Sequence, residues 1–174
     1  SFQAIGGDTK IVEPSSLTIQ DQKGIQAIAG IIGGNKTSVS NNTQNIAVEA
    51  AFFNPDKIAN QARKYGLATD ASHRFERGVD PELQQQALAR FLFLLKEIAQ
   101  YDSIGCYEGS SVKFKPKVIS LNVERFNYFS GLSLSAKKIK LFLETLGFTP
   151  MSIKADHLKF QVPSHRFDME LEED

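Results

Sequence analysis

Residues 49–81 read EAAFFNPDKIANQARKYGLATDASHRFERGVDP, and this stretch decides how the first part of the chain is organised. It opens with a carboxylate and two aromatic residues, continues through Asn54-Pro55, which is typical of a helix start, and reaches a dense polar run at residues 69–78. Packing alone does not require so many hydroxyl and charged groups between two helices. Because binding and catalytic residues concentrate on loops held by rigid elements, this polar run is a candidate site.

Apolar periodicity on both sides of this stretch predicts strands followed by helices. We expect strands over residues 17–21, 25–32 and 46–53, with a tight turn at Gly33-Gly34 after the second strand. One helix is expected to begin at the Asn54 cap and to end at Gly66, and a longer helix to run from Asp80-Pro81 to about residue 100.

The pattern changes at the basic, proline-containing residues 113–117, which we interpret as a linker. Beyond it we expect a strand at 118–121, a helix at 122–130 closed by Gly131, a second helix between Ser135 and Gly147, and a hairpin of residues 148–153 and 158–162. The sequence therefore predicts an α+β fold. A mixed-sheet domain with packed helices occupies residues 1–112, and a small winged-helix-like module occupies residues 118–174.

Composition excludes several classes of protein. Among 174 residues, 20 Lys and Arg balance 20 Asp and Glu, so net charge does not indicate a nucleic-acid partner and only a local patch stays open. The single cysteine, Cys106, excludes a disulfide framework and a cysteine zinc site, which weakly favours a reducing compartment. No apolar run has membrane length, and the first residues do not form a signal peptide. Because the chain starts without Met and stops inside an acidic run, we expect a piece of a longer protein.

Glu49 is a candidate ligand-binding carboxylate. On a strand it would share a face with Ala47 and Ala51, whose small side chains would leave room for a ligand. The alternative is a solvent-facing glutamate on an amphipathic strand. The glycines of residues 30–34 would either expose backbone amides to a ligand or simply form a turn between strands, and no phosphate-binding lysine follows them.

The remaining polar clusters also have two interpretations. Ser72 and His73 are adjacent in sequence, which does not by itself make a catalytic triad, and His73 is more often a structural histidine than a base. Arg74, Glu76 and Arg77 are typical of an ion network that fixes a loop. Asp168, Asp174 and the glutamates between them could gather a hard cation such as Mg²⁺, or form a solvated acidic tail.

Three motifs, in this order, resemble the bacterial phenylalanyl-tRNA synthetase beta subunits: AGIIGG at 29–34, EAAFFNP at 49–55 and TDASHRFERGVDP at 69–81. LGF at 146–148 and PSHRFD at 163–168 extend the resemblance over nearly the whole chain. The resemblance implies that residues 1–112 are the C-terminal part of a tRNA-editing domain. It implies that residues 118–174 are a winged-helix-like domain, truncated at its acidic end and suspected of binding nucleic acid.

The family's activity supplies expectations for the site. The whole enzyme attaches phenylalanine to tRNA(Phe) with ATP, and its editing domain hydrolyses Tyr-tRNA(Phe). It is a cytoplasmic α2β2 tetramer with an alpha subunit and has no membrane partner. The resemblance implies the following roles: substrate binding by Gly33, Glu49, Thr69 and Ala71, catalysis by Thr69 and Glu49, and Mg²⁺ binding by Asp168 and Asp174. An editing histidine lies upstream in the family and two further metal ligands follow residue 174, so we expect this chain alone to be inactive and to hold no ordered Mg²⁺.

Physical chemistry agrees with this assignment. Tyrosine is phenylalanine plus one hydroxyl, so a pocket that accepts tyrosine cannot exclude phenylalanine by size and must recognise the hydroxyl with a hydrogen bond. Glu49 is the natural acceptor, while Thr69, the Gly33 backbone and Ala71 would shape the pocket and orient the ester and the attacking water. No side chain is a convincing nucleophile, so attack by water with help from the terminal ribose of the tRNA is favoured.

Two other functions stay open. One is a non-catalytic tRNA- or DNA-binding module, with its positive charge on Lys113, Lys115, Lys117, Lys137, Lys138 and Lys140. The other is a free-standing trans-editing deacylase, for which the complete reading frame would be short.

Overall fold

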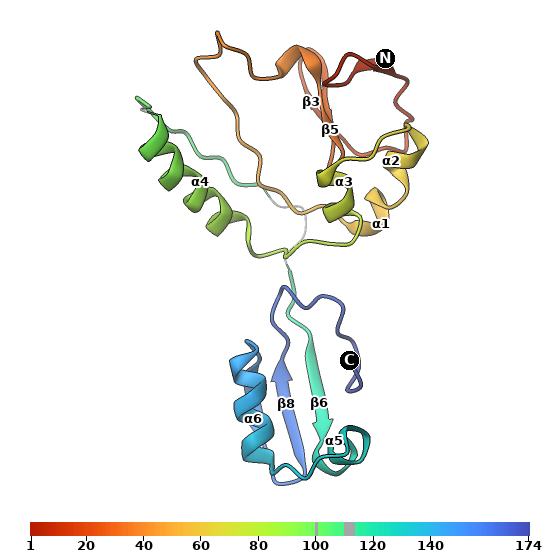
Figure 1. Cartoon of the computed structure of the whole chain (residues 1–174), viewed down its shortest axis with the longest axis vertical. Coiled ribbons are helices and arrows are strands. Elements are labelled where there is room, and N and C mark those ends of the chain that lie inside the picture. Colours follow the sequence, from red (N-terminus) through yellow and green to blue (C-terminus); the bar gives the residue numbers. More distant parts are fainter. Residues whose placement is uncertain (100, 110–113) are drawn as a thin grey trace. The chain divides into compact units, whose positions relative to one another are not determined.

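The chain folds into two compact units, shown in a computed structural model that describes residues 1–99, 101–109 and 114–174 (Figure 1). The first unit contains residues 1–79 and 84–89, and the second contains residues 80–83 and 90–174. Helices and antiparallel sheets occur together, so the predicted α+β class is confirmed. The expected domain boundary at residues 112 and 113, where the predicted linker starts, lies outside the described residues.

The first unit begins with short antiparallel strands. They are β1 (Phe2–Gln3), β2 (Thr9–Lys10), β3 (Thr18–Asp21), β4 (Gly24–Ile28) and β5 (Ile32–Gly33), followed by a 3₁₀ turn at Asn35–Thr37. β1 pairs with β2, and β4 lies between β3 and β5. The predicted strand at 17–21 is confirmed by β3. The predicted strand at 25–32 is too long, because the chain turns after Ile28 at Gly30, whose φ is +66°. The tight turn therefore precedes Gly33, which lies in β5.

Three short helices follow: α1 (Pro55–Ile58), α2 (Gln61–Lys64) and α3 (Asp70–Phe75). Asn54 caps α1 as predicted, because its side-chain oxygen accepts a hydrogen bond from Asp56 N at 2.9 Å. The single helix predicted up to Gly66 is wrong, since Asn60 adopts a left-handed conformation with φ +62° and separates α1 from α2. The polar run at residues 69–78 was expected to be a loop, but its residues 70–75 form α3.

Residues 46–53 form no strand, which corrects the sequence-based expectation. Within the described residues no strand pairs with this segment, and an extended chain becomes a β-strand only by hydrogen bonding to a neighbour. The core of the first unit lies between the sheet and the short helices. Its buried members are Phe2, Ala4, Ile28, Ile31, Ile58, Ala62 and Tyr65.

Helix α4 (Gln84–Ile98) has the expected apolar periodicity but a different start. Asp80-Pro81 does not cap it, and Leu83 occupies the N-cap position without a side-chain hydrogen bond. None of its residues is buried, and Phe93 and Ile98 are exposed. Within the described residues, no helix combines the length and the apolar composition that crossing a membrane requires.

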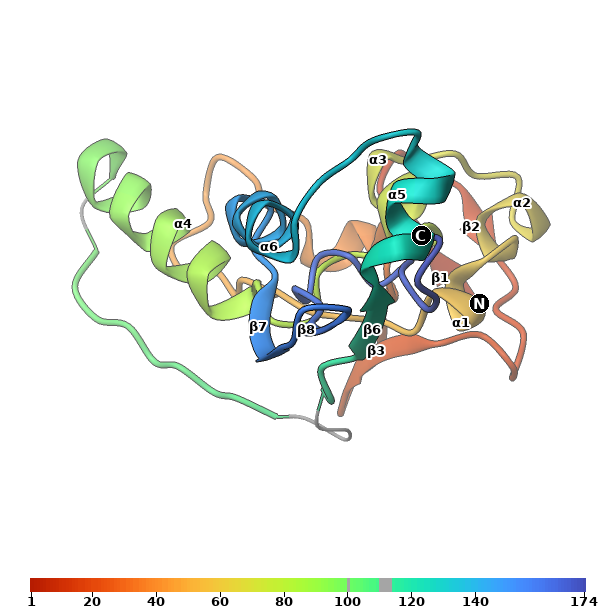
Figure 2. The ribbon, with the colours of Figure 1, turned by 90° about the horizontal axis from the view of Figure 1, so that it is seen from below.

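The second unit follows the predicted order of elements. They are β6 (Val118–Asn122), α5 (Val123–Ser130), α6 (Ala136–Thr145), β7 (Thr149–Ile153) and β8 (His157–Gln161). Asn122 and Ser135 cap the two helices with their side-chain oxygens, and Gly131 closes α5 at φ +68°, all as predicted. The sheet has the antiparallel order β6-β8-β7, and α6 packs against β7 and β8 (Figures 1 and 2).

A compact apolar core holds this unit together. Its buried members are Leu121, Val123, Ile139, Phe148, Leu158, Phe160 and Val162. Phe148 and Phe160 meet edge to face with their ring centroids 6.4 Å apart, a favoured aromatic geometry. Ile139 lies on the apolar face of a helix, which repeats every 3.6 residues, and Leu158 lies on the apolar face of a strand, which repeats every two residues. These two faces meet in the core.

Candidate functional site

Thr69 is the centre of a hydrogen-bonded polar cluster in the first unit, which we call the Thr69 cluster. Its hydroxyl donates a hydrogen bond to the Ile31 carbonyl oxygen at 2.7 Å, which ties α3 to the turn between β4 and β5. The same oxygen accepts a hydrogen bond from Ser72 N at 3.0 Å and so caps α3. The Ser72 hydroxyl binds Thr69 in return, since it accepts from Thr69 N at 3.1 Å and donates to Thr69 O at 2.9 Å. This reciprocal capping box fixes the conformation of Thr69.

Two aromatic rings bring the second motif to the same place. Phe53 and Phe75 pack with ring centroids 5.1 Å apart, and both lie against Gly30. A Cβ atom at residue 30 would lie 3.2 Å from Phe53 Cδ2 and from Phe75 Cβ and Cγ, and its φ of +66° is one that L side chains rarely adopt. Glycine is therefore required at this close approach. The three motifs, which are far apart in sequence, therefore meet at two neighbouring contacts. One is the packing of Phe53 and Phe75 against Gly30, and the other is the hydrogen bond from Thr69 to Ile31.

Gly33 and Ala71 lie on the elements that the Thr69 hydrogen bond connects. Gly33 is in β5, two residues after Ile31, and its carbonyl oxygen accepts a hydrogen bond from Ile5 N at 3.0 Å. A Cβ atom at Gly33 would lie 3.2 Å from the Ile5 side chain, so the glycine permits this close packing. Ala71 is half-buried in the first turn of α3. Their roles in substrate binding stay predictions.

Glu49 is placed differently from the strand-based expectation. It lies in a segment without regular secondary structure, four residues before Phe53, and its side chain is exposed, as the alternative interpretation held. In the part of the chain that the structure describes, its carboxylate makes no hydrogen bond or ion pair. Partial desolvation nevertheless raises the pKa of the Glu49 carboxyl above its ordinary value. An unpaired carboxylate of this kind is free to accept a hydrogen bond from a ligand.

The other charged residues of the polar run pair with one another. Arg74 lies 3.7 Å from Asp70, and Arg77 lies 3.0 Å from Glu76 and donates to the His73 carbonyl oxygen at 2.9 Å. These exposed pairs suit a network that fixes the end of α3. Ser72 uses its hydroxyl on Thr69, so the described hydrogen bonds do not join Ser72 to His73 as a nucleophile and base.

The two predicted metal ligands are already engaged. Both oxygens of Asp168 accept hydrogen bonds from Arg166, at 3.0 and 3.1 Å, and this pairing lowers the pKa of Asp168. Asp174 Oδ2 accepts from the backbone amides of Glu170 and Leu171 at 2.8 and 2.9 Å, which lowers the pKa of Asp174.

As described, these two carboxylates are bound by groups of the protein and are not gathered around a metal ion. No group of three or more His, Cys, Asp or Glu side chains among residues 1–99, 101–109 and 114–174 is placed to hold a metal ion. Magnesium prefers octahedral coordination, and Asp168 would first have to exchange its bonds to Arg166. The assignment of Asp168 and Asp174 as Mg²⁺ ligands stays a prediction.

Sequence reasoning missed two parts of the site. The Ile31 carbonyl oxygen has no side-chain signature and emerged only from the fold. Ser72 had a recognisable signal, because a hydroxyl residue at the N-cap followed three residues later by a hydrogen-bonding side chain is a capping pattern.

Comparisons with known proteins give the same family over both units. The chain is 41% identical over 172 residues to the phenylalanine–tRNA ligase beta subunit of Pseudoalteromonas translucida, an alignment of 98% of this chain and 22% of the relative. The subunits of Pasteurella multocida (42%, covering 98% of this chain and 22% of the relative) and Carboxydothermus hydrogenoformans (42%, covering 91% and 20%) are similar to it as well. The chain spans about a fifth of the length of these curated relatives.

Family-level matches divide along the same lines as the sequence motifs. Residues 1–100 match the B3/4 domain, and residues 119–174 match the tRNA synthetase B5 domain. The first match contains the Thr69 cluster, and the second contains the β6-β8-β7 sheet with α5 and α6. The chain therefore belongs to the phenylalanine–tRNA ligase beta-subunit family, in which it corresponds to a B3/4 domain followed by a B5 domain.

Proposed function

We propose that the first unit forms part of the site at which a phenylalanine–tRNA ligase hydrolyses tyrosine wrongly attached to tRNA(Phe). The observation that carries the proposal is the meeting of three motifs around the Thr69 cluster, with Ile31 and Phe53 supplied by the other two. An ordered hydroxyl beside a backbone turn and two aromatic rings suits an aromatic amino-acid ester. The family membership of the chain supports the tRNA substrate.

Discrimination rests on the tyrosine hydroxyl. A site that pairs this hydroxyl with a carboxylate leaves the carboxylate unpaired when phenylalanine enters, and an unpaired acceptor is costly. Glu49 is our candidate acceptor because its carboxylate has no described partner and has lost part of its water. Thr69, the Gly33 backbone and Ala71 then hold the ester and the water.

The reaction is a simple ester hydrolysis. Water oxygen attacks the ester carbonyl, the bond to the ribose oxygen breaks, and that oxygen takes up a proton, which yields tyrosine and free tRNA. Since Ser72 is committed to Thr69, water is the nucleophile, and the ribose of the tRNA assists. ATP and Mg²⁺ belong to the aminoacylation that we propose for the whole synthetase, a cytoplasmic α2β2 tetramer with an alpha subunit. No step of the proposed hydrolysis uses them.

Deacylation assays test this function directly. A synthetase assembled with this chain in its beta subunit should hydrolyse Tyr-tRNA(Phe) faster than Phe-tRNA(Phe), by on the order of 100-fold or more, because only tyrosine satisfies the carboxylate acceptor. Rates would be followed with radiolabelled amino acids on the same tRNA, with buffer as the control. Equal rates for the two esters, or no acceleration over buffer, contradicts the proposal.

A second candidate function for the second unit is nucleic-acid binding, which one observation favours. Residues 117–167 contain eight Lys and Arg against three Asp and Glu, whereas residues 168–174 contain five acidic residues. The acidic tail pairs with Lys117, Arg125 and Arg166. Lys137 and Lys138 on α6 have no ion pair among the described residues, whereas Lys140 lies 3.3 Å from Glu144.

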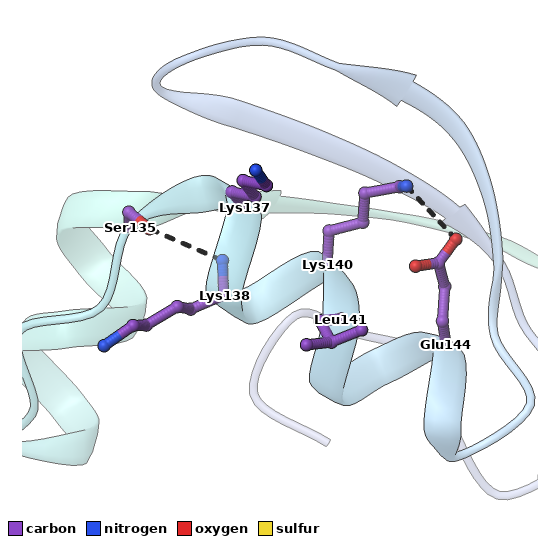
Figure 3. A pocket seen from close by; sticks show the side chains of 6 residues that line it. All are labelled: Ser135, Lys137, Lys138, Lys140, Leu141 and Glu144. Carbon is purple, nitrogen blue, oxygen red and sulfur yellow. Dashed lines mark hydrogen bonds and ion pairs between the residues drawn. The ribbon is translucent and has the colours of Figure 1, made fainter.

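These lysines border a surface hollow of about 400 Å³ beside α6 (Figure 3). Its lining residues are Ser135, Lys137, Lys138, Lys140, Leu141 and Glu144. Unpaired lysines on an exposed helix attract phosphate groups, as a nucleic-acid backbone requires. Lys113, which sequence analysis added to this surface, lies outside the described residues, and Lys117 is held by Glu170 and the Phe167 carbonyl oxygen.

The salt dependence of binding tests this surface. We expect replacement of Lys137 and Lys138 by alanine to weaken binding of a short fluorescent duplex and of tRNA(Phe). It should also reduce the slope of log K against log salt by about 0.9 for each duplex phosphate that the variant no longer neutralises. Alanine at Lys36 and Lys57, two exposed lysines of the first unit, is the matched control. An unchanged slope in the α6 variant rules out this surface.

A free-standing trans-editing deacylase is the remaining alternative. The flanking coding sequence would decide between this alternative and a part of the synthetase.

A further inference from the structure

The hydrogen bonds of Thr69 leave it only one way to bind a substrate. A hydroxyl group has one hydrogen atom and two lone pairs. The Thr69 hydrogen is donated to the Ile31 carbonyl oxygen at 2.7 Å, and one lone pair accepts from Ser72 N at 3.0 Å. A single lone pair is left over. Toward any ligand, Thr69 can therefore accept a hydrogen bond but cannot donate one.

Ser72 is the residue that holds this arrangement. It is the one buried polar residue in the part of the chain that the structure describes, with 5% of its surface exposed. Its hydroxyl accepts from Thr69 N and donates to Thr69 O, so both polar backbone groups of Thr69 are bound by one short side chain. Buried hydroxyl groups with both functions satisfied resist reorientation, because any rotation leaves a polar group unpaired.

We propose that Ser72 is a positioning residue that locks Thr69 as a hydrogen-bond acceptor for a donor group of the aminoacyl ester or for the attacking water. This inference rests on the proposed hydrolysis of Tyr-tRNA(Phe). Thr69 is then neither a nucleophile nor a base, since its proton is held by the Ile31 carbonyl oxygen. Ser72 reaches no substrate atom and acts through Thr69.

A double-mutant cycle in the assembled synthetase tests this role. Thr69→Val removes the acceptor with little change in volume and should slow single-turnover hydrolysis of Tyr-tRNA(Phe) by about 10- to 100-fold, whereas Thr69→Ser should stay within a few-fold of the wild type. Ser72→Ala should slow it by roughly 5- to 30-fold. Because Ser72 acts through Thr69, the double variant should be no more than about two-fold slower than Thr69→Val alone.

Controls separate positioning from a loss of stability. Ser16→Ala removes the serine hydroxyl that binds Tyr65 and Gln61 in the same unit, and its deacylation rate should match the wild type. Ser72→Cys keeps the buried site filled and replaces Ser72→Ala in the test if the alanine variant does not fold. Its rate should lie between those of the wild type and Thr69→Val. Melting curves for every variant show which proteins are folded at the assay temperature.

The donor group is identified with a substrate that lacks the α-amino group. If Thr69 accepts from the α-ammonium group, the penalty of Thr69→Val should disappear with tRNA(Phe) esterified by 3-(4-hydroxyphenyl)propionate, and if it accepts from water or a hydroxyl the penalty should remain. A wild-type rate in folded Ser72→Ala, or rate reductions that multiply in the double variant, overturns the positioning role. No deacylation by the wild type would instead refute the proposed function itself.

Discussion

Replacing Glu49 by alanine should slow the hydrolysis of Tyr-tRNA(Phe) that the assembled synthetase catalyses, because the variant loses about 2–4 kcal/mol of transition-state binding. Charging of the tRNA with phenylalanine should stay nearly intact. The reduction combines one hydrogen bond to a charged acceptor with its desolvation. Glu49→Gln keeps an acceptor without the charge, so its rate should lie between those of the wild type and the alanine variant. The measurement is clearance of mischarged tRNA under single-turnover conditions.

The raised pKa of Glu49 adds a pH dependence to this prediction. Because partial desolvation favours the neutral form, Glu49 takes up its proton at a higher pH than an ordinary glutamate. Hydrolysis should therefore fall on acidification from this higher pH, and the fall should be absent from Glu49→Gln. Glu97→Ala, at an exposed glutamate of α4, is the matched control and should behave as the wild type. Unchanged clearance in Glu49→Ala would remove Glu49 from the site.

Leu158→Ala should cost about 2–5 kcal/mol of the free energy of unfolding of the second unit. Leu158 is fully buried on β8, where it belongs to the same core cluster as Ile139 and Phe160, so the truncation leaves a cavity in that core. Urea unfolding followed by circular dichroism would measure the change in midpoint.

Leu141→Ala makes the same chemical change at a residue of α6 that is 61% exposed, and we expect a change of less than about 0.5 kcal/mol. Similar destabilisation in the two variants would show that the core of the second unit is not where the structure places it. The comparison is made within one unit, so differences between the two units do not enter it.

The second unit was predictable because its signals are local. Asn122, Ser135 and Gly131 each act within a few residues, as caps or as a left-handed stop, and each does so in the structure. The hairpin of β7 and β8 likewise follows from alternation and a short turn. Where neighbours in sequence supply the partner, a pattern is sufficient.

The first unit was less predictable because its partners are remote. Residues 46–53 carry a strand pattern, yet a strand depends on a second chain segment that no local rule specifies. The break between α1 and α2 depends on Asn60 entering a conformation with positive φ, a choice made by tertiary packing. The helix in the polar run could have been predicted from Thr69 and Ser72, because their capping pattern indicates a helix start despite the polar composition.

The candidate site shows the same division. Thr69 was identified from its motif, but its bond to the Ile31 carbonyl oxygen, 38 positions earlier in the chain, could not be. The packing of Phe53 and Phe75 over Gly30 also depends on the fold, although the glycine itself was singled out. Glu49 was selected for a strand face that does not form, and its candidacy now rests on its unpaired carboxylate and raised pKa.

Helix α4 should open locally on a faster timescale than the central strand of the second unit. It has 15 residues and buries none of them, and a helix of about that length is marginal in water without packing. Its amide hydrogens should therefore exchange with solvent through brief local opening. β8 lies between β6 and β7 and carries the buried Leu158 and Phe160, so its amides should exchange only when the second unit unfolds. Hydrogen exchange would thus separate these two elements of one short chain into a fast and a slow population.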